Sequence, residues 1–120
     1  MRKIEQQMVN ALMCGKGWRK DNTIVTARHK SVTEYEAHVF LHNNKIAVLF
    51  FQDMGRSYPT SINISLRGFN TRTTRSRLNA LLQAFVRSRS GIYCKNFEPY
   101  LVTSFGDAAM DSTTWYNIPT

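Results

Sequence analysis

Apolar residues recur at helical spacing in two segments of the chain. The first stripe predicts a short amphipathic helix over residues 2–14, which Gly15 ends. The second predicts a helix that Thr73 or Thr74 caps and that ends within residues 88–91. The two stripes consist of Met1, Ile4, Met8, Ala11 and Leu12, and of Leu78, Leu81, Leu82 and Phe85.

Between these helices the pattern changes to the alternation typical of β-strands. The strands it predicts are Thr23–His29, Tyr35–His42, Lys45–Gln52 and Ser61–Arg67, with a loop over Asp53–Thr60. The middle two flank Asn43-Asn44, which tolerates the positive φ of a tight turn. Both faces of this hairpin are apolar, so we expect it to be central in the sheet. In the strand Ser61–Arg67, we expect the apolar residues inside and Ser61, Asn63, Ser65 and Arg67 outside.

After the second helix, Ile92–Phe97 predicts a last strand that Pro99 limits, although Tyr100–Val102 has the composition to pair again. The element order α-β-β-β-β-α-β predicts an α+β fold. We expect a small antiparallel sheet of about four or five strands with both helices packed on one face. For 120 residues we expect a single domain over residues 1–102, followed by a polar tail over 103–120 that wraps the domain or becomes ordered on a partner.

Charge is distributed very unevenly along the chain. The sequence has 16 Lys and Arg against 8 Asp and Glu, a formal net charge of +8, and no acidic residue lies between Met54 and Phe97. The basic residues of this window are Arg56, Arg67, Arg72, Arg75, Arg77, Arg87, Arg89 and Lys95. Basic and acidic residues balance outside it, so the window accounts for the whole net charge. This predicts an anionic partner: nucleic acid, an anionic membrane surface or an acidic protein.

Three of these arginines crowd the start of the second helix, where acidic residues are normally preferred. Arg72, Arg75 and Arg77, with the neighbouring hydroxyls and free N–H groups, would form a cradle for phosphate. A line at four-residue spacing continues along the helix through Asn79, Gln83 and Arg87, and Asn and Gln can also read adenine edges. We expect Arg56, Arg67 and Arg89 to make secondary contacts.

Two other interpretations of the same charge stay open. Acids elsewhere in the fold, such as Glu5, Glu34 or Glu36, can match the arginines, and the stem of Arg77 can cover an edge of the core. Aromatic residues do not decide between them. With both helices on one side, His38, Phe40 and His42 could lie on an open sheet face and stack single-stranded bases, but strand aromatics more often belong to a core.

No catalytic or metal-binding motif is visible, so we expect neither an enzyme nor a cofactor or metal. Cys14 and Cys94 stand alone and are expected to be buried, reduced thiols of a cytosolic protein. His38 and His42 would lie about 13 Å apart along a strand, too far to ligate one metal. No run of about 18 apolar residues predicts a membrane helix, and polar residues in the N-terminal segment argue against a secretory signal.

Two parts of the chain resemble a known group of proteins. One is Met1-Arg-Lys-Ile-Glu-Gln-Gln-Met8 followed by Trp18 and Asn22-Thr23. The other is Val39-Phe-Leu-His42 with Ile46-Ala47, then the run Thr71-Arg-Thr-Thr-Arg-Ser-Arg-Leu-Asn-Ala-Leu81. Over roughly residues 1–97 they resemble small uncharacterised proteins of tailed bacteriophages, especially those of marine bacteria. The resemblance implies action in the host bacterial cytoplasm or in the virion, and it carries no known activity.

The sequence therefore supports three hypotheses. The first is a non-enzymatic phage protein that binds DNA or RNA through the arginine-rich helix start. The second is an interaction protein that docks on an acidic host or virion protein. The third is a small enzyme acting on a nucleotide or phosphorylated substrate. No membrane association is expected, and the exposed edges of a small sheet are compatible with a homodimer.

Overall fold

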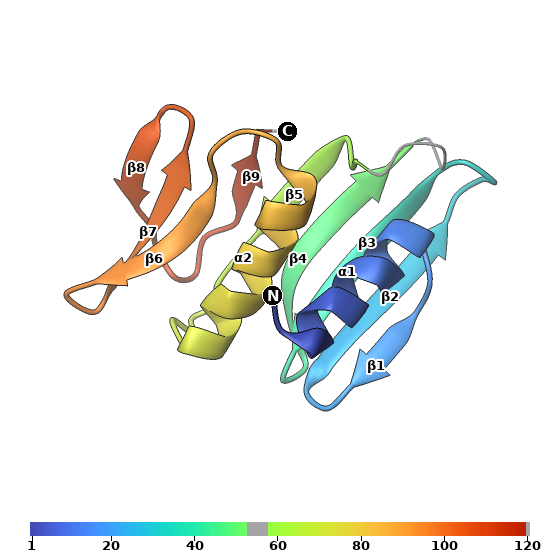
Figure 1. Ribbon diagram of the computed structural model, residues 1–120, viewed down its shortest axis with the longest axis horizontal. Helices are drawn as coiled ribbons and strands as arrows, with labels where there is room; N and C mark the ends of the chain where they lie inside the picture. Colours follow the sequence, from blue (N-terminus) through green and yellow to red (C-terminus); the bar gives the residue numbers. More distant parts are fainter. Residues whose placement is uncertain (53–57, 120) are drawn as a thin grey trace.

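The computed structural model describes residues 1–52 and 58–119 of the chain. Within them the chain forms two helices and nine strands (Figure 1). Six strands make an antiparallel sheet in the order β1-β2-β3-β4-β5-β9, here sheet A, and three make sheet B in the order β6-β7-β8. The elements are α1 (Lys3–Cys14), β1 (Trp18–Lys20), β2 (Thr23–His29), β3 (Tyr35–Leu41), β4 (Asn44–Phe51), β5 (Ser61–Ile64), α2 (Arg72–Phe85), β6 (Gly91–Lys95), β7 (Glu98–Thr103), β8 (Gly106–Ala109) and β9 (Tyr116–Ile118).

Both helices cover the same face of sheet A, as the sequence predicts (Figure 1). Alternate strand residues face them and are buried, as in the run Ala37, Val39 and Leu41 of β3. The helices contribute their apolar stripes, including Met8 of α1 and Leu81 of α2, to one core with these residues. The two helices run in the same direction, so their N-terminal ends lie at the same end of the molecule (Figure 1). The predicted α+β class is confirmed.

The central hairpin is confirmed, but its turn is displaced by one residue. Strands β3 and β4 occupy the two middle positions of sheet A. The turn is made by His42 and Asn43, with φ of 50° and 67°, rather than by Asn43-Asn44, because Asn44 pairs with Leu41. The register then shifts between Val39 and Phe40, which leaves Ile46 as an extra residue on β4.

The strand predicted to reach Arg67 stops at Ile64. Ser65 turns inward instead of facing solvent and is fully buried, and its N–H donates to the carbonyl of Ile46, the extra residue of β4. The hydroxyl of Ser65 accepts the N–H of Arg67, whose φ is 52°. The alternation of apolar and polar residues therefore predicts the wrong side for Ser65, because the extra residue of β4, Ile46, changes the pairing beyond Ile64.

Both ends of α2 differ from the prediction. Thr71, not Thr73 or Thr74, caps the helix: its backbone is extended and its hydroxyl accepts the N–H of Thr74 at 3.1 Å. Several threonines in one run made the sequence signal ambiguous. The helix ends at Phe85, before residues 88–91, because Val86 adopts an extended conformation and leads into β6.

The C-terminal third of the chain contains more structure than the sequence predicts. The expected strand over Ile92–Phe97 is β6, and residues 98–103 form a second strand that includes Pro99. Proline lacks only an N–H, and the Pro99 carbonyl still accepts the N–H of Met110 at 2.9 Å. The segment 103–120, predicted as a tail, contributes β8 and the edge strand β9 of sheet A. The prediction of buried thiols was wrong, since Cys14 and Cys94 are both exposed.

The C-terminal end of α1 is fastened to sheet A by one tyrosine. The Tyr35 hydroxyl donates to the carbonyls of Leu12 at 2.8 Å and Met13 at 3.1 Å. The side chain is almost fully buried, and this burial, with a smaller contribution from the thiolate of Cys14, raises the pKa of Tyr35 to about 12.

We therefore expect stability to fall with rising pH in a defined window. Because the pKa of Tyr35 is raised from 10.0 to about 12, its contribution is complete below pH 10 and is lost between pH 10 and pH 12. The slope from this group is at most about 1.4 kcal/mol per pH unit. Urea unfolding at several pH values should show that Tyr35→Phe is less stable below pH 10 and has a shallower decline above it. Equal slopes for both proteins would contradict the assignment.

Candidate nucleic-acid interface

The arginine-rich start of α2 is held in place by local hydrogen bonds. Besides the Thr71 cap, Arg75 reaches back to the preceding turn, and its Nη1 donates to the carbonyl of Asn70 at 3.1 Å and to its Oδ1 at 2.5 Å. Arg72 is exposed, and the first turn of α2 contains no acidic residue. Because one nitrogen of Arg75 makes both bonds, its other N–H groups stay available.

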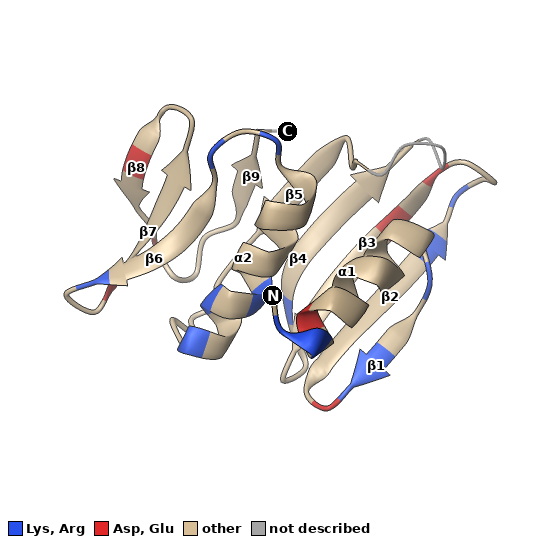
Figure 2. Cartoon of the chain, viewed as in Figure 1, with Lys and Arg blue, Asp and Glu red and all other residues tan. Residues whose placement is uncertain are grey.

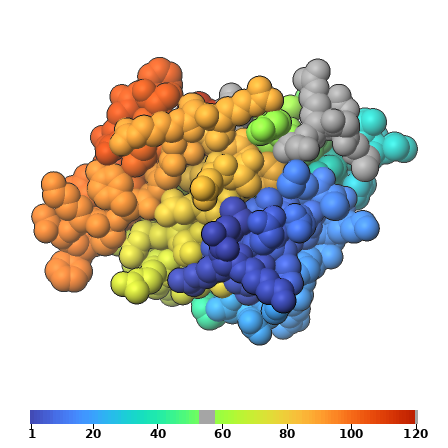
Figure 3. Space-filling view, viewed as in Figure 1, coloured from blue at the N-terminus to red at the C-terminus, as the bar shows by residue number. Residues whose placement is uncertain are grey.

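The N-terminal segment of the chain lies beside this helix start, so that basic residues far apart in sequence come together (Figure 2). Arg2 and Glu5 from one segment and Arg72, Arg75 and Gln83 from α2 line a groove of about 350 Å³, here called the basic groove. Figure 3 shows the first residues packed against α2 on the surface of this face. Arg2 occupies the N-cap position of α1 without a side-chain cap. The first N–H groups of α1 therefore add to the positive potential there.

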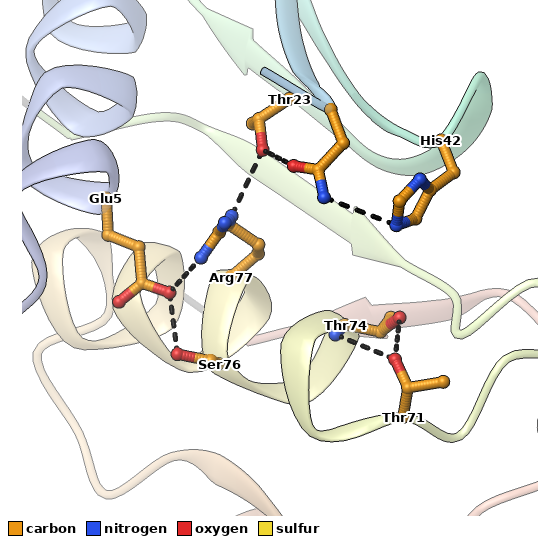
Figure 4. Close-up of polar contacts among 8 residues, drawn as sticks. Glu5, Thr23, His42, Thr71, Thr74, Ser76 and Arg77 are labelled. Atoms are coloured by element: carbon orange, nitrogen blue, oxygen red, sulfur yellow. Dashed lines mark hydrogen bonds and ion pairs between the residues drawn. The ribbon is translucent and has the colours of Figure 1, made fainter. Parts of the chain in front are cut away.

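Arg77 is removed from this surface because it is an interior residue (Figure 4). It is only 5% exposed, and its Nη1 donates to Glu5 Oε2 at 2.8 Å. Its Nε donates to Thr23 Oγ1 at 3.1 Å, and the same Glu5 oxygen accepts the Ser76 hydroxyl at 2.6 Å. The predicted phosphate contact of Arg77 is thus replaced by a buried ion pair that joins α1, α2 and β2. The pair also neutralises Glu5, an acid of the basic groove.

Asn79 lines the basic groove as predicted, but its side-chain amide is also bonded within the protein. Its Nδ2 donates to the carbonyl of Ile92 at 2.9 Å, and its Oδ1 accepts the N–H of Ile92 at 2.6 Å. This side chain substitutes for a neighbouring strand and ties β6 to α2. These two bonds fix the side chain at the wall of the basic groove, which Gln83, one turn further and exposed, also lines.

The remaining arginines of the basic window lie away from the groove. The guanidinium of Arg87 stacks 4.2 Å from the ring centre of Tyr58, and Arg89 pairs with Asp107 at 3.2 Å. Arg67 donates to the carbonyl of Lys45 at 3.4 Å and lies 5.9 Å from the ring of Trp115. Arg56 lies outside the described residues. The line of polar residues predicted along α2 therefore follows the groove as far as Gln83 and does not include Arg87.

Acids outside the basic window neutralise some of its arginines, which is one of the alternatives that the sequence left open. Glu5 matches Arg77 and Asp107 matches Arg89, both from outside the basic window. Glu36 does not pair with an arginine but is hydrogen-bonded to His38 at 2.9 Å. This hydrogen bond lowers the pKa of the Glu36 carboxyl, and the charges of His38 and of nearby lysines lower it further. Within residues 1–52 and 58–119 no three His, Cys, Asp or Glu side chains gather in a way that could hold a metal ion.

Sequence reasoning missed one feature of this site and left another as an open alternative. Arg2 was overlooked because nothing local connects it to a helix start 70 positions later. The Glu5–Arg77 pair, in contrast, left a signal: both residues fall on the apolar stripes of their helices, beside Met8 and Leu81 at helical spacing. A charged residue within such a stripe is buried unless it snorkels, so it indicates a partner of opposite charge.

Comparison with known proteins gives the family and nothing on activity. The family model of the Kyanoviridae Gp96 protein matches residues 1–118, nearly the whole chain. No curated protein and no solved structure matches it. In the part of the chain that the structure describes, no helix is long and apolar enough to cross a membrane. The resemblance to tailed-phage proteins is thus confirmed, and the chain belongs to the Kyanoviridae Gp96 protein family of the tailed cyanophages.

Proposed function

We propose that this phage protein binds nucleic acid through the phosphate backbone, at the basic groove and without catalysis. The observation that carries the proposal is the convergence of Arg2, Arg72 and Arg75, from two separate segments, around one groove. The groove's acid, Glu5, is already neutralised by Arg77. Guanidinium groups with helix N–H groups behind them match the oxygens of phosphate. The protein would act in the cytoplasm of the infected host or in the virion.

The charge that remains after internal pairing favours a polyanion over a single small anion. Each of the two acid–arginine pairs of the basic window cancels one charge of each sign, so the residues outside them still carry the full formal net charge of +8. The groove is open and elongated along α2 rather than closed around one ligand. A backbone that passes from Arg2 over Arg72 towards Gln83 would find donors along its length.

Binding should depend steeply on salt, and two arginines should account for part of that dependence. We expect Arg2→Gln with Arg72→Gln to reduce the slope of log K against log salt by about 0.7–0.9 for each phosphate that the variant no longer neutralises. Arg75 is left unchanged because it also holds Asn70. Fluorescence anisotropy with labelled single-stranded DNA, duplex DNA and RNA, between low and physiological salt, measures the slope.

A matched control removes the same charge elsewhere. Lys16→Gln with Lys95→Gln changes two exposed lysines that do not line the groove, so it should leave the slope almost unchanged. Equal reductions of the slope in the two double variants would mean that only net charge matters and would remove the groove assignment. No binding by the unchanged protein at low salt would overturn the proposed function itself.

One observation favours interaction with a protein as the second candidate. Phe97 and Phe105, at the two turns of sheet B, are 96% and 89% exposed. Exposed aromatic residues of this size often anchor protein–protein contacts. Under this alternative, a host protein should copurify with the chain, and the complex should persist at high salt. The variant with Phe97→Ser and Phe105→Ser should not retain this host protein. Nucleic acid should not copurify with the unchanged chain.

A further inference from the structure

The face of sheet A opposite the helices forms a second surface with a distinct composition. No described helix crosses it (Figure 1). Side chains that alternate with the core residues lie here, and those at its centre are half-buried: Ile24, His38, Phe40, Val48 and Phe50. An apolar and aromatic row on an uncovered sheet face needs an explanation, because alternating strands normally place polar residues there.

The two phenylalanines lie on neighbouring central strands, at opposite ends of this row. Phe40 of β3 pairs with Lys45, His38 with Val48, and Glu36 with Phe50 of β4. Successive pairs on one face are roughly 6.7 Å apart, so the rings lie two steps apart with His38 between them. The ring of His38 is 6.3 Å from that of Phe40. Flat bases could therefore stack at both ends and pass over the imidazole in the middle.

Cations surround this row. The Nζ of Lys45 lies 5.8 Å from the ring centre of Phe40, and the Nζ of Lys30 lies 5.5 Å from that of Phe50. Arg19 and Arg28 share the face, opposite Ile24 and Glu36 respectively. Two acids lie close to them among the described residues: Glu36, which is held by His38 at 2.9 Å, and Glu34 at the Phe50 end. A basic border around aromatic rings is complementary to a strand that presents bases inward and phosphates outward.

A cavity extends the row at the Phe50 end. It measures about 280 Å³ and is lined by Lys30, Glu34, Phe50 and Ser61, among others. Its wall combines an aromatic ring, a cation and hydrogen-bonding groups, which is the combination that holds an unstacked base. Further along the sheet, the Asn117 amide donates to Asn63 Oδ1 at 3.1 Å. The two asparagines at the polar end of the face therefore hydrogen-bond to each other.

We propose that this face binds single-stranded nucleic acid, with bases stacked on Phe40 and Phe50 and phosphates near Lys30, Lys45 and Arg28. Single-strand binders combine stacking platforms with a basic border in this way. A duplex keeps its bases stacked inside and cannot use the rings. A second copy of the chain is less well matched, because two such faces would bring like charges together.

The inference rests on the proposed function and makes it specific to strand form, at a surface separate from the basic groove. Two variant sets therefore test the two surfaces independently. Phe40→Leu with Phe50→Leu keeps apolar volume on the sheet but removes the stacking rings. We expect it to weaken binding of a labelled oligothymidylate by at least about tenfold at 150 mM salt, and to change binding of a duplex of equal length by less than about twofold.

Two further variants make the test specific to stacking and charge. Phe40→Tyr with Phe50→Tyr keeps both aromatic rings and should retain single-strand affinity within about threefold. Glu36→Gln removes the acid that lies between the two rings and leaves Glu34 of the cavity in place, and it should raise single-strand affinity. Urea unfolding verifies that each variant is folded at the assay temperature.

Each outcome separates the two proposals. If the leucine variant binds single strands as well as the parent while Arg2→Gln with Arg72→Gln weakens binding, the face proposal fails and the groove stands. If only the leucine variant loses affinity, the face stands and the groove fails. If the unchanged protein binds no nucleic acid, both fail. A concentration-dependent dimer that the leucine substitutions dissociate would assign the face to a second copy and overturn the inference.

Discussion

Arg77→Ala should lower the free energy of unfolding by about 3–5 kcal/mol, because it leaves a buried carboxylate without its partner. Arg77 and Glu5 are 5% and 3% exposed, and their ion pair joins both helices. Removing the guanidinium also deprives Thr23 of its hydrogen bond from Nε. Urea unfolding followed by circular dichroism measures the decrease. Arg72→Ala, on the same helix but exposed, should change stability by less than about 0.5 kcal/mol.

A second variant distinguishes the effect of an unpaired charge from that of poorer packing. Arg77→Met with Glu5→Leu removes both charges and keeps apolar volume, and it should recover most of the stability. If the proposed function holds, this double variant should also keep its affinity for nucleic acid, since it leaves the net charge unchanged and replaces a groove acid that Arg77 already neutralises. If Arg77→Ala were nearly neutral in stability yet abolished binding, the residue would be a ligand contact and the interior assignment would be wrong.

Phe51→Ala is expected to cost about 3–5 kcal/mol, the usual range for a fully buried aromatic residue. Phe51 is 2% exposed and stands between two other rings. It is stacked on Tyr35 with ring centres 4.6 Å apart and meets Phe85 of α2 edge-on at 5.7 Å. Its removal would leave a cavity where β3, β4 and α2 meet. The thermal and urea midpoints should both fall.

The neighbouring residue provides a matched control for this substitution. Phe50 lies on the same strand but on the uncovered face and is half-buried. Phe50→Ala should therefore cost only about 1 kcal/mol, since a smaller apolar area returns to water. Similar decreases in stability at the two positions would mean that the uncovered face is part of a packed interior, against both the core assignment and the single-strand surface.

Features with a local signal could be predicted from the sequence. The first helix and its end at Gly15 depend on a stripe and one left-handed residue with φ of 62°. The central hairpin depends on apolar residues on both faces of Tyr35–Leu41 and Asn44–Phe51. In each case the residues that decide the structure lie within a few positions of one another. The errors there are shifts of one residue at the ends.

Features set by contacts between distant residues could not be predicted. The edge strand β9 consists of three residues and pairs with β5, more than fifty positions earlier, so composition alone did not reveal it. The same holds for the candidate site: Arg77 was grouped with Arg72 and Arg75 by sequence position, whereas its neighbours are Glu5 and Thr23. Proximity along a helix start is a poor guide to which arginines share a surface.

Because α1 and α2 run in the same direction, the molecule has an electric dipole moment along the helices. Helix dipoles that point the same way add, so the end that carries Arg2 and Arg72 is positive relative to the other end. A protein with such a moment turns in the field of a polyanion while it diffuses, and this raises the rate of productive encounter. Since the screening length at physiological salt is only about 8 Å, the proposed binding of nucleic acid should lose association rate as well as affinity when salt is added.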